Sequence, residues 1–98
     1  MNMFIRLVKI DKKWGSHNEY YLSEVIINTT QIVYMAENTD LKTALTEGKM
    51  NLNLNKVTGF TNLKLNSRND TAVITVVGDP STIEGKIAAK PIKKLLRD

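Results

Sequence analysis

The chain has 98 residues, no cysteine and a formal net charge of +4. This length suits a single domain over residues 1–98, and the lack of cysteine excludes disulfides, thiolate nucleophiles and Cys-ligated metals. No stretch approaches the roughly 18 apolar residues of a membrane span, and the beginning of the chain, MNMFIRLVKIDKK, has no apolar signal core. We therefore expect a cytoplasmic protein without membrane contact.

Three apolar segments in the first part of the chain predict three β-strands. Residues 4–10 (FIRLVKI) are apolar enough on both faces to indicate an internal strand. Residues 11–18 have turn chemistry, and residues 19–27 (EYYLSEVII) then predict a second strand, antiparallel to the first. Residues 31–37 (QIVYMAE) predict a third strand after a short polar break. Three strands in succession suggest a meander.

The middle of the chain changes character. Residues 38–48 carry apolar residues at helical spacing, with Asp40 as a cap and Gly48 as a stop, so both a short helix and a loop stay open. Residues 49–55 (KMNLNLN) alternate strictly between apolar and polar, and the alternation returns on the opposite parity in residues 60–66. This phase flip indicates a bulge or a turn between two strands. Because asparagine disfavours strands, residues 60–66 are the better strand.

A dense β-branched run marks residues 71–77 as the central strand, covered on both faces. The polar residues 67–70 connect it to the preceding strand as a hairpin. Gly78-Asp79-Pro80 ends the strand and opens a helix over residues 81–89. Two caps fit equally well: a capping box from Ser81 to Glu84, or Asp79 with Pro80 at the first helical position.

Pro91 ends that helix and can open a second short helix, with Ile92, Leu95 and Leu96 on its apolar side. Together the elements predict an α+β fold. It consists of a bent antiparallel sheet, or partly open small barrel, of about five strands. One C-terminal helix and a short terminal helical turn cover this sheet.

The order of these segments carries a resemblance. The strand IRLVKI, the strand pair YLSEVIINTTQIVYM, the strand and helix VITVVGDPSTIEGKI, and the basic end KKLLRD resemble small uncharacterised proteins of marine T4-like tailed bacteriophages. The layout is more distantly similar to short FlbD-type proteins of flagellar operons. The resemblance covers most of the chain, but its motifs are fold-making, so it implies no site residues.

The sequence predicts no enzyme. His17, the only histidine, lies beside Ser16 in a loop, where near neighbours cannot form a dyad without a third group to orient the base. The carboxylates are dispersed, without the spacing of an acid–base pair or a metal site. At the helix start, Asp79 places negative charge where an anion would bind, and Pro80 removes a backbone donor. We expect no cofactor, no metal and no small-molecule substrate.

The loop around the only tryptophan is the best candidate contact surface. Lys12 and Lys13 precede Trp14, and an aromatic ring next to cations suits stacking on single-stranded nucleic acid. For a lone Trp in a hairpin loop, we favour the alternative that Trp14 covers one end of the sheet. The candidate contact residues are Lys12, Lys13, Trp14, His17, Lys90, Lys93, Lys94 and Arg97.

Two functions follow from these features. Exposed strand edges invite pairing with a second copy, so the first is a non-enzymatic accessory or scaffold protein that acts as a homo-oligomer or through protein partners. The alternative is a nucleic-acid-binding module that uses the Lys12-Lys13-Trp14 loop and the basic C-terminus. Its partner would be nucleic acid or an acidic protein.

Overall fold

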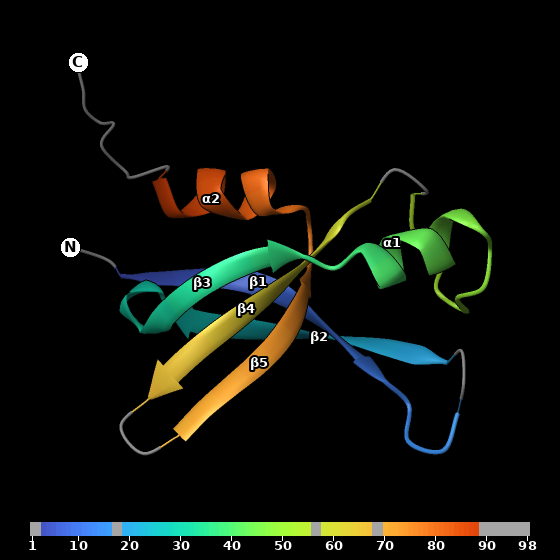
Figure 1. The fold of residues 1–98 in the computed structure, drawn as a ribbon, viewed down its shortest axis with the longest axis horizontal. Helices are drawn as coiled ribbons and strands as arrows, with labels where there is room; N and C mark the ends of the chain where they lie inside the picture. The colour runs from blue at the N-terminus through green and yellow to red at the C-terminus, as the bar shows by residue number, and fades with distance from the viewer. Residues whose placement is uncertain (1–2, 17–18, 56–57, 68–69, 89–98) are drawn as a thin grey trace.

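The computed structural model describes residues 3–16, 19–55, 58–67 and 70–88 (Figure 1). The fold is α+β, with an open antiparallel sheet of five strands and two α-helices, which confirms the predicted class. The elements in chain order are β1 (Phe4–Lys12), β2 (Tyr20–Asn28), the 3₁₀ turn η1 (Thr29–Gln31), β3 (Ile32–Glu37), α1 (Thr39–Thr46), β4 (Phe60–Ser67), β5 (Asp70–Val77) and α2 (Pro80–Ala88). No helix in these described ranges is long and apolar enough to cross a bilayer.

The strand order in the sheet is β2-β1-β5-β4-β3, and every neighbouring pair is antiparallel. β1 is internal and β5 is central, as predicted. The predicted meander is wrong at its third strand, because β3 pairs with β4 at the far edge and not with β2. The physical reason lies in the Asn28 side chain. Its Oδ1 accepts hydrogen bonds from the Thr30 backbone N–H (3.1 Å) and hydroxyl (2.8 Å), and this turns the chain into η1.

The short connection at η1 requires a curved sheet. β2 and β3 are the two ends of the strand order, yet only the three residues of η1 join them. In a flat sheet, four spacings of about 4.8 Å would separate these strands by roughly 19 Å. Three residues of 3₁₀ helix rise only about 6 Å. The sheet therefore curls until its two edge strands approach each other at this corner, next to α2 in Figure 1.

Two hydrophobic clusters lie on opposite faces of the sheet. The first consists of Leu7, Ile27, Leu63, Val76 and Ile83, the last of which comes from α2. The second consists of Ile10, Leu45 and Phe60, with Leu45 contributed by α1. Leu7 and Ile10 are three residues apart on one strand, so their side chains point to opposite faces.

Residues 49–55 are not a strand, but their alternation has a structural meaning. Met50, Leu52 and Leu54 pack against the second cluster, while the asparagines between them are exposed. The segment therefore covers one end of this face together with α1.

The first half of β5 corrects one prediction. Val76 is fully buried, but Val73 is 57% exposed, so the central strand is not covered on both faces along its whole length. The second cluster reaches only the end of the sheet where α1 and residues 49–55 lie, and Val73 is outside it.

Residues 39–46 form a helix, which settles the choice between helix and loop. Its N-cap is Asn38 and not Asp40: Asn38 Oδ1 accepts the Leu41 backbone N–H at 3.0 Å. Asp40 lies in the first turn, where a carboxylate interacts favourably with the helix dipole. Gly48, with φ +73°, follows the helix end as predicted.

The second of the two predicted caps opens α2. Pro80 is the first helical residue, and Asp79 Oδ1 accepts the Thr82 backbone N–H at 2.9 Å. The hydrogen bonds from Thr82 lower the pKa of the Asp79 carboxyl. Gly59 allows this turn to form, since a Cβ there would lie 2.8 Å from the Asp79 Cβ.

Ile83 and Ile87 of α2 both face the first cluster, as the helical spacing predicted. The predicted helical turn from Pro91 onward lies outside the described residues.

Candidate interaction site at the β1–β2 hairpin

Backbone hydrogen bonds join the described residues at the tip of the β1–β2 hairpin. The Lys13 backbone N–H donates to Glu19 O at 2.7 Å, and the Ser16 N–H donates to Lys13 O at 3.1 Å. Gly15 occupies the left-handed region, with φ +80°, which a side chain there would strain. These contacts hold the position from which residue 14 projects.

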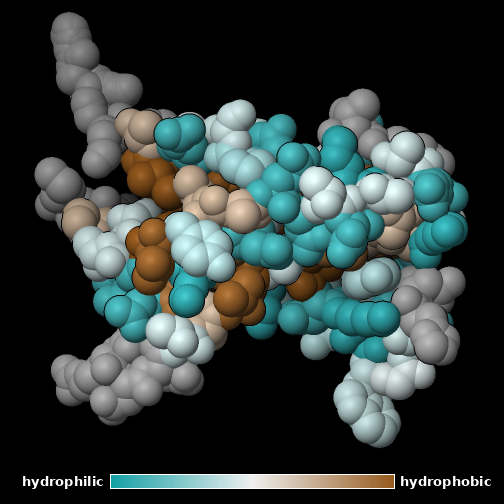
Figure 2. Space-filling model, viewed as in Figure 1, coloured by the Kyte–Doolittle hydropathy of each residue, from teal (hydrophilic) through white to brown (hydrophobic). Residues whose placement is uncertain are grey.

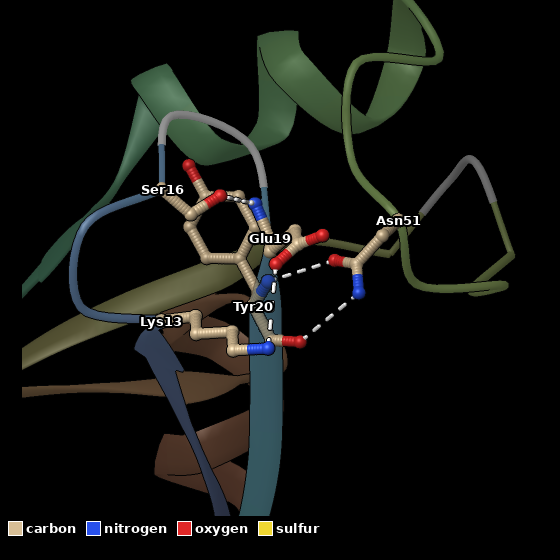
Figure 3. Close-up of polar contacts among 5 residues, drawn as sticks. All are labelled: Lys13, Ser16, Glu19, Tyr20 and Asn51. Carbon is tan, nitrogen blue, oxygen red and sulfur yellow. Dashed lines mark hydrogen bonds and ion pairs between the residues drawn. The ribbon is translucent and has the colours of Figure 1, made fainter.

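Side chains reinforce this turn (Figure 3). Ser16 Oγ accepts the Glu19 backbone N–H at 3.1 Å, and Lys13 Nζ lies 3.6 Å from Glu19 Oε1. The ion pair is exposed, so screening by water makes it weak. Its consequence is electrostatic: Glu19 offsets part of the positive charge of the tip.

The side chain of Asn51 bonds to the backbone at the start of β2, as a neighbouring strand would. Its Oδ1 accepts the Tyr20 backbone N–H at 2.7 Å and its Nδ2 donates to Tyr20 O at 3.3 Å (Figure 3). This role of Asn51 was not predicted from the sequence. The signal was present in the alternation of residues 49–55, whose polar positions were interpreted only as unfavourable for a strand.

Trp14 projects from the tip into solvent, with 97% of its surface exposed. The prediction that it covers one end of the sheet is therefore wrong. Met50, Leu52 and Leu54 pack at that end instead, together with Tyr20.

The predicted contact residues come together only in part. Lys12, Lys13 and Trp14 are exposed neighbours at the tip. The other predicted members, His17, Lys90, Lys93, Lys94 and Arg97, lie outside the described residues. A second ion pair, Lys9 Nζ to Asp11 Oδ2 at 3.5 Å, lies on β1 near the tip.

β2 is a regular edge strand next to this tip, and no other strand of the described residues pairs with its outer side. The bonds Lys13 N–H to Glu19 O and Thr29 N–H to Met3 O flank nine residue pairs without a break in register. In such a ladder, hydrogen-bonded pairs alternate with non-hydrogen-bonded pairs. Odd-numbered residues of β2 therefore bond to β1, and even-numbered residues direct their N–H and C=O groups away from it. Tyr20 fits this rule, since both of its groups reach Asn51.

The side chains of the same hairpin form a partly apolar outer surface. Its large exposed apolar members are Phe4, Val8, Leu22 and Ile26. Arg6 Nη1 donates to Glu24 Oε1 at 3.0 Å among them, and a shallow hollow is lined by Phe4, Ile5, Arg6 and Ile26. Apolar side chains are also exposed on the face drawn in Figure 2. Elsewhere in the sheet, Val33 of β3 and Val73 of β5 are exposed.

No group of three His, Asp or Glu side chains in the described part of the chain is placed to hold a metal ion. Comparison with protein-family models, curated proteins and solved structures gives no match. The resemblance to phage and FlbD-type proteins and the cytoplasmic location stay predictions from the sequence.

Proposed function

We propose that this protein is a non-enzymatic accessory or scaffold protein that acts by self-association. The observation that carries the proposal is the outer edge of β2, a nine-residue strand without a bulge, which pairs with no other strand among the described residues. Long, regular edge strands are templates for pairing with another chain, because their outward N–H and C=O groups can complete a ladder. The exposed side chains Leu22 and Ile26 of the same strand supply apolar area for such a contact.

The proposal includes the finer features of the fold that we expect. The curled sheet acts as a partly open small barrel, and α2 covers its open end. Such an arrangement provides a frame that supports β2 as a strand-pairing surface.

Static light scattering over a wide range of protein concentration tests this function. We expect the average mass to rise above the 11.1 kDa of one chain as concentration increases. A mass that stays at one chain at the highest soluble concentration would contradict self-association. Higher salt should not lower the average mass, because backbone pairing and apolar contact are not screened as charges are.

A second function is favoured by Trp14, which we propose as a stacking platform for single-stranded nucleic acid. Its 97% exposure at the hairpin tip, next to Lys12 and Lys13, is what base stacking beside a phosphate chain requires. The ion pair of Lys13 with Glu19 reduces the positive charge at the tip, which makes this the second candidate function.

A fluorescence titration with single-stranded DNA and RNA tests the second function, since Trp14 is the only tryptophan. Binding should quench the fluorescence at low salt and weaken as salt rises, because counterions are released from the phosphates. Trp14→Ala should cost about 1–3 kcal/mol of binding free energy and leave the melting temperature unchanged. Unchanged fluorescence at low salt would exclude this role.

A further inference from the structure

We propose that β2 pairs antiparallel with β2 of a second copy of this chain, about a two-fold axis that passes through Glu24. The two five-stranded sheets then join into one continuous sheet of ten strands. The inference rests on the proposed self-association and specifies which strand pairs, in which register, and what limits the contact.

The backbone of β2 supplies the register. The even-numbered residues direct their peptide groups outward, as the bonds at both ends of the hairpin require. Tyr20 is already bonded to Asn51, which leaves Leu22, Glu24 and Ile26 before the chain turns into η1. An antiparallel second copy places Leu22 opposite Ile26 and Glu24 opposite Glu24. Every outward N–H and C=O of these residues then has a backbone partner.

Registers shifted by two residues leave more of the outward backbone groups of β2 without a partner. A shift by two residues in one direction brings Tyr20 opposite Ile26, and Asn51 already occupies the groups of Tyr20. A shift in the other direction brings Asn28 opposite Leu22. Asn28 is the N-cap of η1, where the chain leaves the strand. Asn51 and η1 therefore act as stops at the two ends of the pairing segment.

The side chains are compatible with this arrangement. Leu22 and Ile26, both exposed in one copy, become cross-strand neighbours and are removed from water on both sides of the axis. The two Glu24 side chains meet at the axis, where like charges repel. Arg6 lies 3.0 Å from Glu24 in each copy, so each carboxylate arrives with its own counter-charge.

The area involved predicts a weak complex. Pairing of residues 22–26 on each strand covers less surface than the roughly 1,600 Å² of a standard interface. The dimer should therefore dissociate on dilution.

Cross-linking tests the register directly, because the chain has no cysteine of its own. Glu24→Cys should give a covalent dimer with a short bis-maleimide, since residues opposite each other in a hydrogen-bonded pair have Cα atoms about 5.5 Å apart. An equal mixture of Leu22→Cys and Ile26→Cys should cross-link more efficiently than either variant alone. Val73→Cys, on β5, is the control and should stay monomeric. Efficient dimers from Val73→Cys and none from Glu24→Cys would overturn the proposal.

Sedimentation equilibrium of three variants tests the energetics. Ile26→Lys should weaken association about tenfold or more, whereas Val73→Lys, at a site of nearly equal exposure (57% against 59%), should leave it unchanged. Glu24→Gln removes the repulsion between the two carboxylates but also the counter-charge of Arg6, so it should change association less than Ile26→Lys does. If the unmodified chain stays monomeric at all concentrations, the proposed function itself fails. If it dimerises and Ile26→Lys has no effect, only the β2 pairing is wrong.

Discussion

β2 runs for nine residues against β1 in unbroken register, whereas β3 runs for six residues against β4 with a register shift between Ile32 and Tyr34. Both are edge strands of the same sheet. Val33 is the extra residue at the shift, so β3 carries a bulge. α2 also contacts β3 and β4.

This difference separates a protected edge from an open one. Short length, a bulge and a neighbouring helix are features by which natural sheets avoid pairing with other chains, and β3 has all of them. Among the described residues, β2 has Asn51 at one end and the charge of Glu24 in the middle. β3 therefore has the features of an edge strand that is protected from pairing with another chain, and β2 lacks them in the part of the chain that the structure describes.

Proline substitutions at two adjacent positions of β2 should have the largest effects of the variants considered. Val25→Pro removes an N–H that faces Leu7 of β1, so a ladder hydrogen bond is lost and its acceptor is left unpaired. We expect the free energy of unfolding to fall by about 2–4 kcal/mol. Glu24→Pro removes an outward N–H and should lower stability much less, while it weakens self-association.

Urea unfolding followed by circular dichroism measures both variants. The order of the two effects is the decisive result, because it depends only on which residues face β1. Equal destabilisation by Val25→Pro and Glu24→Pro would mean that the outward edge of β2 is misassigned.

Asn51→Ala should have the next largest effect. It removes both hydrogen bonds to the Tyr20 backbone and should lower the free energy of unfolding by about 1 kcal/mol. The matched control is Asn53→Ala, another exposed asparagine of the same alternating segment. Because Tyr20 then becomes free to pair, Asn51→Ala should also strengthen self-association. An equal loss of stability in both variants would remove the special role of Asn51.

The strands were predictable from sequence because each is a compact apolar run bounded by turn residues. Their order was not: the hydrogen bonds of Asn28 that direct β3 away from β2 have no distinct sequence signature. The position of Trp14 was also beyond local reasoning. It depends on competition with Met50 and Leu52, more than thirty residues away in sequence, for the same end of the sheet.

The predicted contact site shows the same limit. Lys12, Lys13 and Trp14 are neighbours in sequence and stay neighbours in space. The capping of Tyr20 by Asn51 joins segments 31 residues apart, whose approach depends on the tertiary fold. The position of the hairpin tip was therefore predictable from the sequence, but the contacts that stabilise it were not.

Asp79→Ala tests α2, the helix beside the protected edge. The pKa of Asp79 is lowered in the folded protein by hydrogen bonds from Thr82, so its carboxylate stabilises the fold above the unfolded pKa. That contribution is lost as the pH falls through the folded pKa. The variant should be less stable at pH 7, and the difference should disappear in acid. Thermal unfolding at several pH values measures it, and a difference independent of pH would contradict the charge-based role.

Deletion of Val33 should have the smallest effect on stability and the most specific effect on association. Val33 is the extra residue of the bulge and is more than half exposed, so its deletion joins Ile32 and Tyr34 without moving either side chain to the other face. The deletion is made in the Ile26→Lys background, in which the β2 edge is blocked. Stability should change by less than about 1 kcal/mol, but β3 becomes an unbroken edge. We expect concentration-dependent association to return in light scattering. If the double variant stays monomeric, the bulge is not what protects β3, and its short length or the neighbouring α2 is sufficient.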